Sequence, residues 1–146
     1  MEITINTGYE TIEVSVVSVH PIATLRFRNV NTNESFIVKS SSSFPSRETQ
    51  ELWSWAKARG YAFPSVKQMK IIHRVYNGCL HKWLIENDIH FNFSSSYITN
   101  EVLSGVIENP YGEDFVINKF VCYSSMNDTI LIKDADDYSH YVLVEK

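Results

Sequence analysis

Alternation of apolar and polar residues dominates the first third of the chain. Residues 11–19 (TIEVSVVSV) and 23–30 (ATLRFRNV) alternate and are rich in β-branched and aromatic residues, which is typical of half-buried strands. A turn at 31–33 (NTN) separates the second strand from 34–39 (ESFIVK). The pattern therefore predicts an N-terminal β-hairpin.

The apolar spacing changes to three and four residues in the middle of the chain. Met69, Ile72 and Tyr76 recur at these steps, followed by further apolar residues up to residue 83, which predicts an amphipathic helix. Ser65 and Gln68 match a capping box, in which each side chain bonds the backbone N–H of the other residue. The helix should therefore begin after Ser65.

The tripeptide Phe-Pro-Ser occurs twice, at 44–46 and at 63–65. The second copy contains the predicted cap at Ser65. The first copy predicts another helix, with Ser46 as its N-cap and Gly60 at its end. Asn77-Gly78 is expected to divide the later helix into two pieces.

The last third of the chain returns to strand patterns. Residues 101–108, 114–124, 129–134 and 138–145 predict strands, separated by turn-forming residues. The order of elements predicts a single α+β domain, with a β-hairpin, two to three helices and then an antiparallel sheet. Its expected segments are a β segment at 1–45, a helical segment at 46–87 and an antiparallel β segment at 88–146.

Composition supports a folded domain outside the membrane. The chain has 146 residues, of which 44% are hydrophobic and 21% charged, so it can form one sizeable core. No apolar run approaches the roughly 18–20 residues of a membrane helix, and the N-terminus has no features of a signal peptide. We therefore expect a cytoplasmic protein, or a protein of the host cytoplasm or the virion if a phage encodes it.

Reactive residues do not form a recognisable catalytic or metal-binding motif. Cys79 and Cys122 lack metal-ligand spacing, and their apolar surroundings predict two buried free thiols. The five histidines are scattered, and the chain has no phosphate-binding or nucleophile motif. The sequence predicts no catalytic residue, no metal and no cofactor. An enzyme without a recognisable motif, using His73 or His81, stays as an alternative.

Three segments resemble a family of short C-type-lectin-like domains of bacterial and phage surface proteins, such as the C-terminal domains of collagen-like adhesins. Residues 60–69 (GYAFPSVKQM) match the helix-start motif, 91–96 (FNFSSS) match the aromatic-Trp-Ser-Ser segment, and 141–144 (YVLV) match the final strand. Phe93 stands where Trp is usual. The resemblance spans residues 60–145 and implies a C-type-lectin-like fold.

Sugar-binding lectins of this fold hold Ca²⁺ with Glu-Pro-Asn and Trp-Asn-Asp motifs. Here residues 108–110 read Glu-Asn-Pro, and residues 126–128 read Met-Asn-Asp. Because Ca²⁺ takes about six to eight oxygen ligands, two altered triplets favour ordinary turns over a calcium site.

Charge is distributed unevenly along the chain. Residues 52–85 contain six basic residues and no Asp or Glu, whereas residues 86–146 contain three basic and eleven acidic residues, a net charge of 3 − 11 = −8. Lys67, Lys70 and Arg74 recur at helical steps opposite the apolar face, so they should form a basic stripe that faces water. A solvated face that complements the protein's own acidic sheet is the simpler interpretation of this stripe, because charged helix faces are common and a domain this acidic is not a typical nucleic-acid binder.

These features favour a non-catalytic protein-binding module. A small phage protein of this type would be a virion adhesin or an inhibitor of a host factor, and its partner would carry an acidic patch. A nucleic-acid-associated protein that uses the basic stripe is the alternative. The predicted contact residues are Lys67, Lys70, Arg74, Lys82 and Tyr111.

Overall fold

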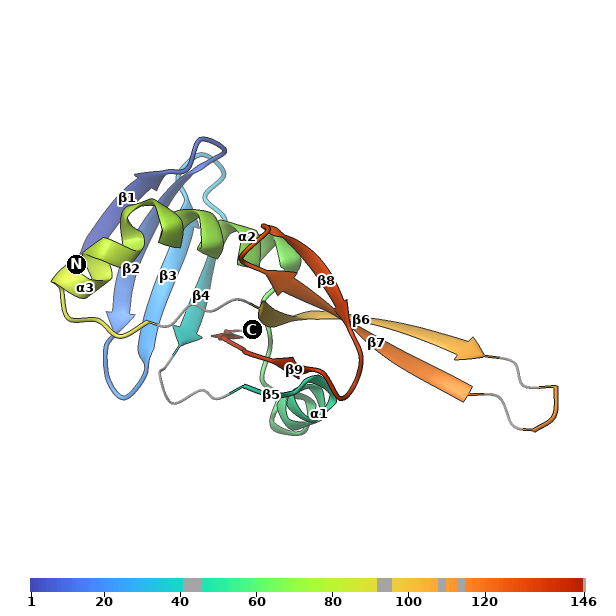
Figure 1. Ribbon diagram of the computed structural model, residues 1–146. Helices are drawn as coiled ribbons and strands as arrows, with labels where there is room; N and C mark the ends of the chain where they lie inside the picture. Colours follow the sequence, from blue (N-terminus) through green and yellow to red (C-terminus); the bar gives the residue numbers. More distant parts are fainter. Residues whose placement is uncertain (41–45, 92–95, 108–109, 113–114, 146) are drawn as a thin grey trace.

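The computed structural model describes residues 1–40, 46–91, 96–107, 110–112 and 115–145. Helices and antiparallel sheets are mixed, so the predicted α+β class is confirmed. Figure 1 shows two groups of strands joined by helices, and a long hairpin that extends away from the rest of the molecule.

An antiparallel meander forms the N-terminal sheet. Its strands are β1 (Glu2–Asn6), β2 (Thr11–Ser18), β3 (Ala23–Asn29) and β4 (Ser35–Ser40), and they pair in chain order. The sheet is larger than the predicted hairpin, because the unpredicted β1 joins it and the C-terminal β10 (Leu143–Val144) pairs with β4. The two ends of the chain therefore belong to one sheet.

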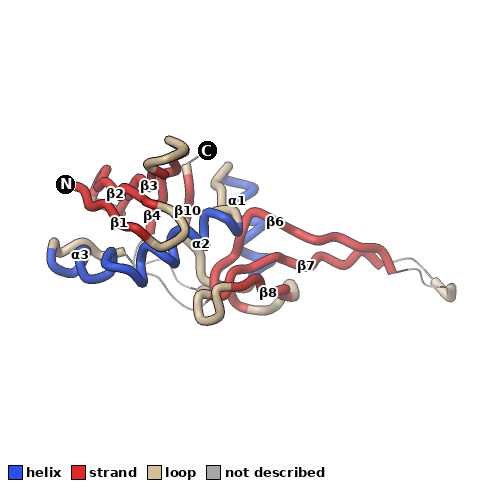
Figure 2. The backbone as a smooth tube through the Cα atoms, turned by 90° about the horizontal axis from the view of Figure 1, so that it is seen from above, coloured by secondary structure: helices blue, strands red, loops and turns tan. Residues whose placement is uncertain are grey.

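Three consecutive helical segments cover one face of this sheet (Figures 1 and 2). They are α2 (Val66–Val75), the π-helical turn η1 (Tyr76–Leu80) and α3 (His81–Glu86). Met69, Ile72 and Val75 are completely buried in a core that also contains Leu25 and Phe27 of β3. The period-two pattern of the strands and the helical spacing of α2 thus supply the two halves of one core.

The second group of strands contains the long hairpin. It consists of β6 (Ser96–Ile107), β7 (Phe115–Ser124) and β8 (Thr129–Lys133), in the order β6-β7-β8. Helix α1 (Thr49–Arg59) buries Leu52 and Ala56 against a smaller cluster that contains Ile98 of β6. In two perpendicular views, the distal part of the β6–β7 hairpin projects beyond the remainder of the molecule (Figures 1 and 2).

The first helix does not begin as predicted. Ser46 is not its cap, because Arg47–Glu48 form the short strand β5, which pairs with β9 (Tyr138–Ser139), and Glu48 is the N-cap residue. The backbone N–H groups of Thr49 and Gln50 donate instead to the carbonyls of Asp137 and Ala135. A distant turn therefore satisfies these helix-terminal donors. The predicted end is confirmed, since Gly60 has the left-handed φ of 69°.

The prediction of one continuous strand over residues 138–145 is wrong. It is divided into β9, which pairs with β5, and β10, which pairs with β4. Between them, the backbone of His140 exchanges hydrogen bonds with Ser96 and Ile98 of β6. This last segment therefore crosses between sheets, since its backbone groups find partners on three different strands.

The predicted break at Asn77-Gly78 is confirmed. Gly78 has a non-helical ψ of −114°, and the backbone widens into the π-helical turn η1. An added Cβ at Gly78 would lie 3.3 Å from Cγ2 of Ile5 in β1, so the glycine permits close packing of η1 on the sheet. The wider turn also explains why Cys79 is exposed and not buried as predicted, whereas Cys122 is buried.

Among the residues that the structure describes, no helix is long and apolar enough to cross a membrane.

Helix α2 carries the capping box predicted from the sequence. The Gln68 amide donates to Ser65 Oγ at 3.0 Å, and the Ser65 amide donates to Gln68 Oε1 at 2.9 Å. We expect Ser65→Ala to lower the free energy of unfolding by about 0.5–2 kcal/mol, because a helix-terminal donor loses its acceptor. Urea denaturation followed by circular dichroism measures this change. A loss below the error of the measurement would show that the cap does not stabilise the helix.

Candidate binding groove beside helix α2

A groove lies between α2 and the strands β2 to β4. Its volume is about 580 Å³. The apolar side chains that line it are Ile12, Phe36, Val66 and Ile71. The charged side chains that line it are Glu10, Glu34, Lys67, Lys70 and Arg74. The groove thus combines apolar surface with charges of both signs, which suits the recognition of a polar chain with apolar side chains.

The groove brings together three of the five predicted contact residues. Lys67 is exposed and its Nζ lies 3.7 Å from Glu34 Oε2, whose side chain is also exposed. Lys70 is half-buried and forms no ion pair with the residues that the structure describes. The exposed ion pair between Lys67 and Glu34 contributes about 0–1 kcal/mol to the free energy of unfolding. Lys67 and Lys70 are therefore available to a partner at little cost to the fold.

Arg74 does not face water as predicted. Only 24% of its side chain is exposed, and its Nη1 lies 3.7 Å from Glu10 Oε1. Its Nε is buried and lies 3.8 Å from Asp128 Oδ2, too far for a hydrogen bond. Its guanidinium carbon lies 4.1 Å from the ring centre of Tyr9, within the range of a cation–π contact. The positive charge of Arg74 thus interacts with carboxylates and an aromatic ring of its own chain.

Asp128 links this arginine to the buried core. The Tyr123 hydroxyl donates to Asp128 Oδ1 at 2.7 Å, and Tyr123 is completely buried. Burial raises the pKa of Tyr123, and the bond to Asp128 raises it further, so the phenol stays protonated and continues to donate. We call Glu10, Arg74, Asp128 and Tyr123 the Arg74 cluster. It joins the β1–β2 turn, α2 and the β7–β8 turn.

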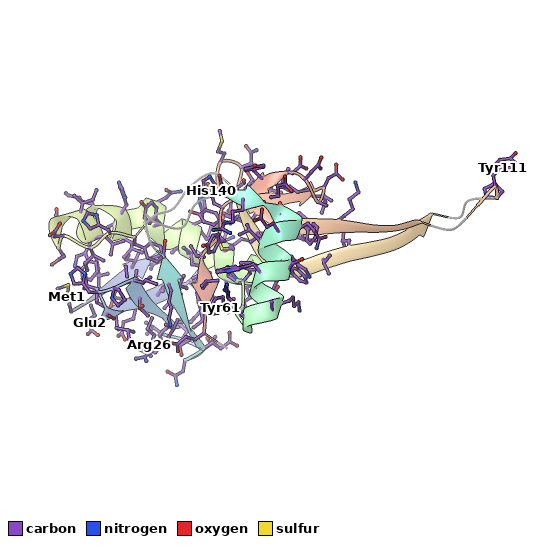
Figure 3. The ribbon with its side chains drawn as sticks, turned by 90° about the horizontal axis from the view of Figure 1, so that it is seen from below. Met1, Glu2, Arg26, Tyr61, Tyr111 and His140 are labelled. Carbon is purple, nitrogen blue, oxygen red and sulfur yellow. The ribbon has the colours of Figure 1, made fainter. Side chains whose placement is uncertain are left out.

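The two other predicted contact residues lie away from the groove. Lys82 lies on α3, where its Nζ is 3.9 Å from Glu86 Oε1. Tyr111 lies at the tip of the long hairpin and is 97% exposed. Figure 3 shows Tyr111 at the far end of the hairpin, whereas Tyr61 and His140 belong to the body. The five residues therefore do not form one surface.

The sequence reasoning missed Glu10, Tyr9 and Asp128 as partners of Arg74. Their positions carried a signal, because Gly8 and the Asn127-Asp128 pair are residue types that favour tight turns. No pattern in the sequence shows that these two turns meet at the same face of α2. Arg74 therefore lies beside the protein's own carboxylates Glu10 and Asp128, but not on the solvated face that the alternative interpretation expected.

Among the described residues, no group of three or more His, Cys, Asp or Glu side chains could hold a metal ion. Cys122 has its pKa raised by burial, which keeps it in the unreactive thiol form. Comparisons with protein-family models, with curated proteins and with solved structures find no match for this chain.

The geometry of the Arg74 cluster predicts a cost for removing the arginine. Arg74→Met should lower the free energy of unfolding by about 1–3 kcal/mol, because it leaves Glu10 and Asp128 without their shared partner. Lys67→Met is the matched control, since it removes an exposed ion pair and should cost less than about 1 kcal/mol. Urea denaturation of both variants gives the comparison. Equal losses would show that the cluster does not stabilise the fold.

Two histidines predict a pH dependence of stability. Burial lowers the pKa of His73, whose ring packs edge-on against Tyr123 at 5.8 Å, and burial together with Lys133 lowers the pKa of His140. Both histidines therefore bind a proton more readily in the unfolded state than in the folded state. Their contribution to the free energy of unfolding is present above pH 6.5, the ordinary pKa of histidine, and is lost as the pH falls below that value.

We therefore expect the change in unfolding free energy between about pH 7.5 and about pH 5.5 to be smaller in His73→Gln/His140→Gln than in the wild type. Urea denaturation at both pH values measures the two differences. The carboxylates titrate in both proteins, so they cancel in the comparison. Identical differences would exclude a contribution from these histidines.

Proposed function

We propose that this chain is a non-catalytic protein-binding module that holds an acidic segment of a partner protein in the groove beside α2. The observation that carries the proposal is the shared position of Lys67 and Lys70 above the apolar lining of the groove. Apolar surface supplies affinity when a partner covers it. The two lysines select an acidic chain and accelerate its association.

The groove is held in shape before a partner arrives. Arg74 ties α2 to Glu10 at one end of the groove, and the capping box fixes the first turn of α2 at the other. A rigid groove reduces the conformational entropy that is lost on binding. Displacing Glu34 from Lys67 costs little, because both side chains are exposed.

A protein partner is favoured over nucleic acid. The basic run at 52–85 supports nucleic-acid binding, but Arg74 is paired with Glu10, and much of the groove lining is apolar, which suits the side chains of a protein better than a phosphate backbone. The resemblance to C-type-lectin-like domains supports a surface or adhesin role in a phage. A virion adhesin and an inhibitor of a host factor are both consistent with a groove that binds protein.

Charge reversal in the groove tests the proposal. The chain is immobilised and used to capture proteins from the lysate of a candidate host, with wild type, Lys67→Glu/Lys70→Glu and Lys82→Glu in parallel. Lys82 is the matched control, since it is exposed on α3 outside the groove. We expect the amount of partner captured at low salt to fall by an order of magnitude or more in the double variant, because the two glutamates repel an acidic partner.

Retention of the same partner by the folded double variant would contradict the proposal. Equal losses in all lysine variants would indicate an effect of net charge and not of the groove. A nucleic-acid partner gives a different signature, because its affinity in a gel-shift series falls with log salt at a slope of about −0.9 per phosphate neutralised.

A further inference from the structure

Strand β8 presents an apolar, unpaired edge. It is the last strand of the sheet β6-β7-β8, and no other described strand pairs with its outer side. Its three central residues, Ile130, Leu131 and Ile132, are 51%, 40% and 47% exposed. Successive side chains of a strand point to opposite faces, so both faces of this edge are apolar.

Apart from its shortness and the inward-turned Lys133, β8 lacks the usual protections of an edge strand. Edges are commonly blocked by outward charges, proline or a bulge. The five residues of β8 contain no proline, and their pairing with β7 is regular. The charge of Lys133 is turned inward, where its Nζ donates to Ser96 Oγ and to the carbonyl of Tyr138. The next charge, Asp134, is paired with Lys119.

The opposite edge of the same sheet is protected. At the base of β6, the backbone of His140 bonds to Ser96 and Ile98 and covers that side. The base of β6 is therefore closed by the chain itself, whereas β8 is open and apolar. A strand from outside the molecule can add to β8 without displacing any strand of the fold.

The residue order of β8 is matched to itself. In an antiparallel pair centred on Leu131, Leu131 faces the second copy's Leu131, and Ile130 faces the second copy's Ile132. Thr129 then faces the second copy's Lys133, so no like charges oppose each other within the strand. We propose that β8 pairs in this register with β8 of a second copy of the chain, forming a dimer.

The charges that flank the strand do not favour this register, but each of them has a partner within its own chain. Asp128 would lie opposite the second copy's Asp134, which would ordinarily oppose pairing. Each is already engaged within its own chain, Asp128 by Arg74 and Tyr123, and Asp134 by Lys119. Their mutual repulsion is thereby reduced.

The dimer would contain one continuous sheet in the order β6-β7-β8-β8-β7-β6. Since the central pair is antiparallel, the two long hairpins would extend in opposite directions (Figure 1). Five residues of strand from each copy form an interface below the standard size of about 1,600 Å². The dimer is therefore expected to form reversibly and to depend on concentration.

The mass in solution tests the proposal. Sedimentation of the full chain over a range of concentrations should show the mass rising from 16.9 kDa toward twice that value. Leu131→Lys and Leu131→Glu should each raise the dissociation constant of the dimer at least about tenfold, since each places like charges at the symmetry axis. An equimolar mixture of the two should restore dimers, which also shows that both variants are folded.

Leu103→Lys provides a matched control, because Leu103 is an exposed leucine on β6, 52% exposed against 40% for Leu131. It should leave the dissociation constant unchanged. A wild-type chain that keeps the monomer mass at millimolar concentration would overturn the proposal. So would a mixture of the two charge variants that stays monomeric.

Disulfide trapping tests the register. Leu131→Cys, in a background with Cys79→Ser and Cys122→Ala, should form a covalent dimer rapidly on oxidation, because facing Cβ atoms lie about 4.5–5.5 Å apart. Thr129→Cys in the same background should not, since the two cysteines would be offset by four residues, about 13 Å. Trapping at Thr129 without trapping at Leu131 would show a different interface and overturn the proposed one.

Discussion

The fold depends on how Arg74 is paired. This side chain stands on α2 between Glu10 of the first hairpin turn and Asp128 of the last one, so one cation connects the N-terminal sheet to the β6–β8 sheet. Taking a guanidinium partly out of water is costly unless carboxylates are close by. The two turns must therefore stay in place against α2, and Tyr123 helps by holding Asp128 from inside the core.

Helix α2 serves two surfaces at once. Its apolar face completes the main core through Met69, Ile72 and Val75. Its opposite side forms one wall of the groove, where Lys67 and Lys70 are spared from strong internal pairing. In the proposed function, the charge that pairs within the fold and the charges that meet a partner are thereby separated within one helix. Arg74 lies beside Glu10 and Asp128, and Lys67 and Lys70 lie nearer the helix start.

The β6–β8 sheet differs from the N-terminal sheet in its exposure to solvent. The N-terminal sheet gains a fifth strand from the C-terminus and is covered on one face by helices. The β6–β8 sheet extends a hairpin beyond the body and has an apolar edge at β8. Two-stranded ribbons are only marginally stable in water. The projecting hairpin and the open edge therefore offer, besides the groove beside α2, surfaces for contacts with other chains.

The sequence by itself determined the local elements of this protein. The capping box at Ser65, the helix end at Gly60, the break at Gly78 and the strands around 11–18 and 23–29 follow from short-range patterns, because caps, turns and apolar spacing act within a few residues. Only the tertiary structure decided which distant segments meet. The backbone donors at the start of α1 find their acceptors in a turn 85 to 88 residues later, and Arg74 meets carboxylates from both halves of the chain. A charge pattern along the sequence shows that cations are present, but whether each faces water or a carboxylate depends on packing between elements that are far apart in the chain.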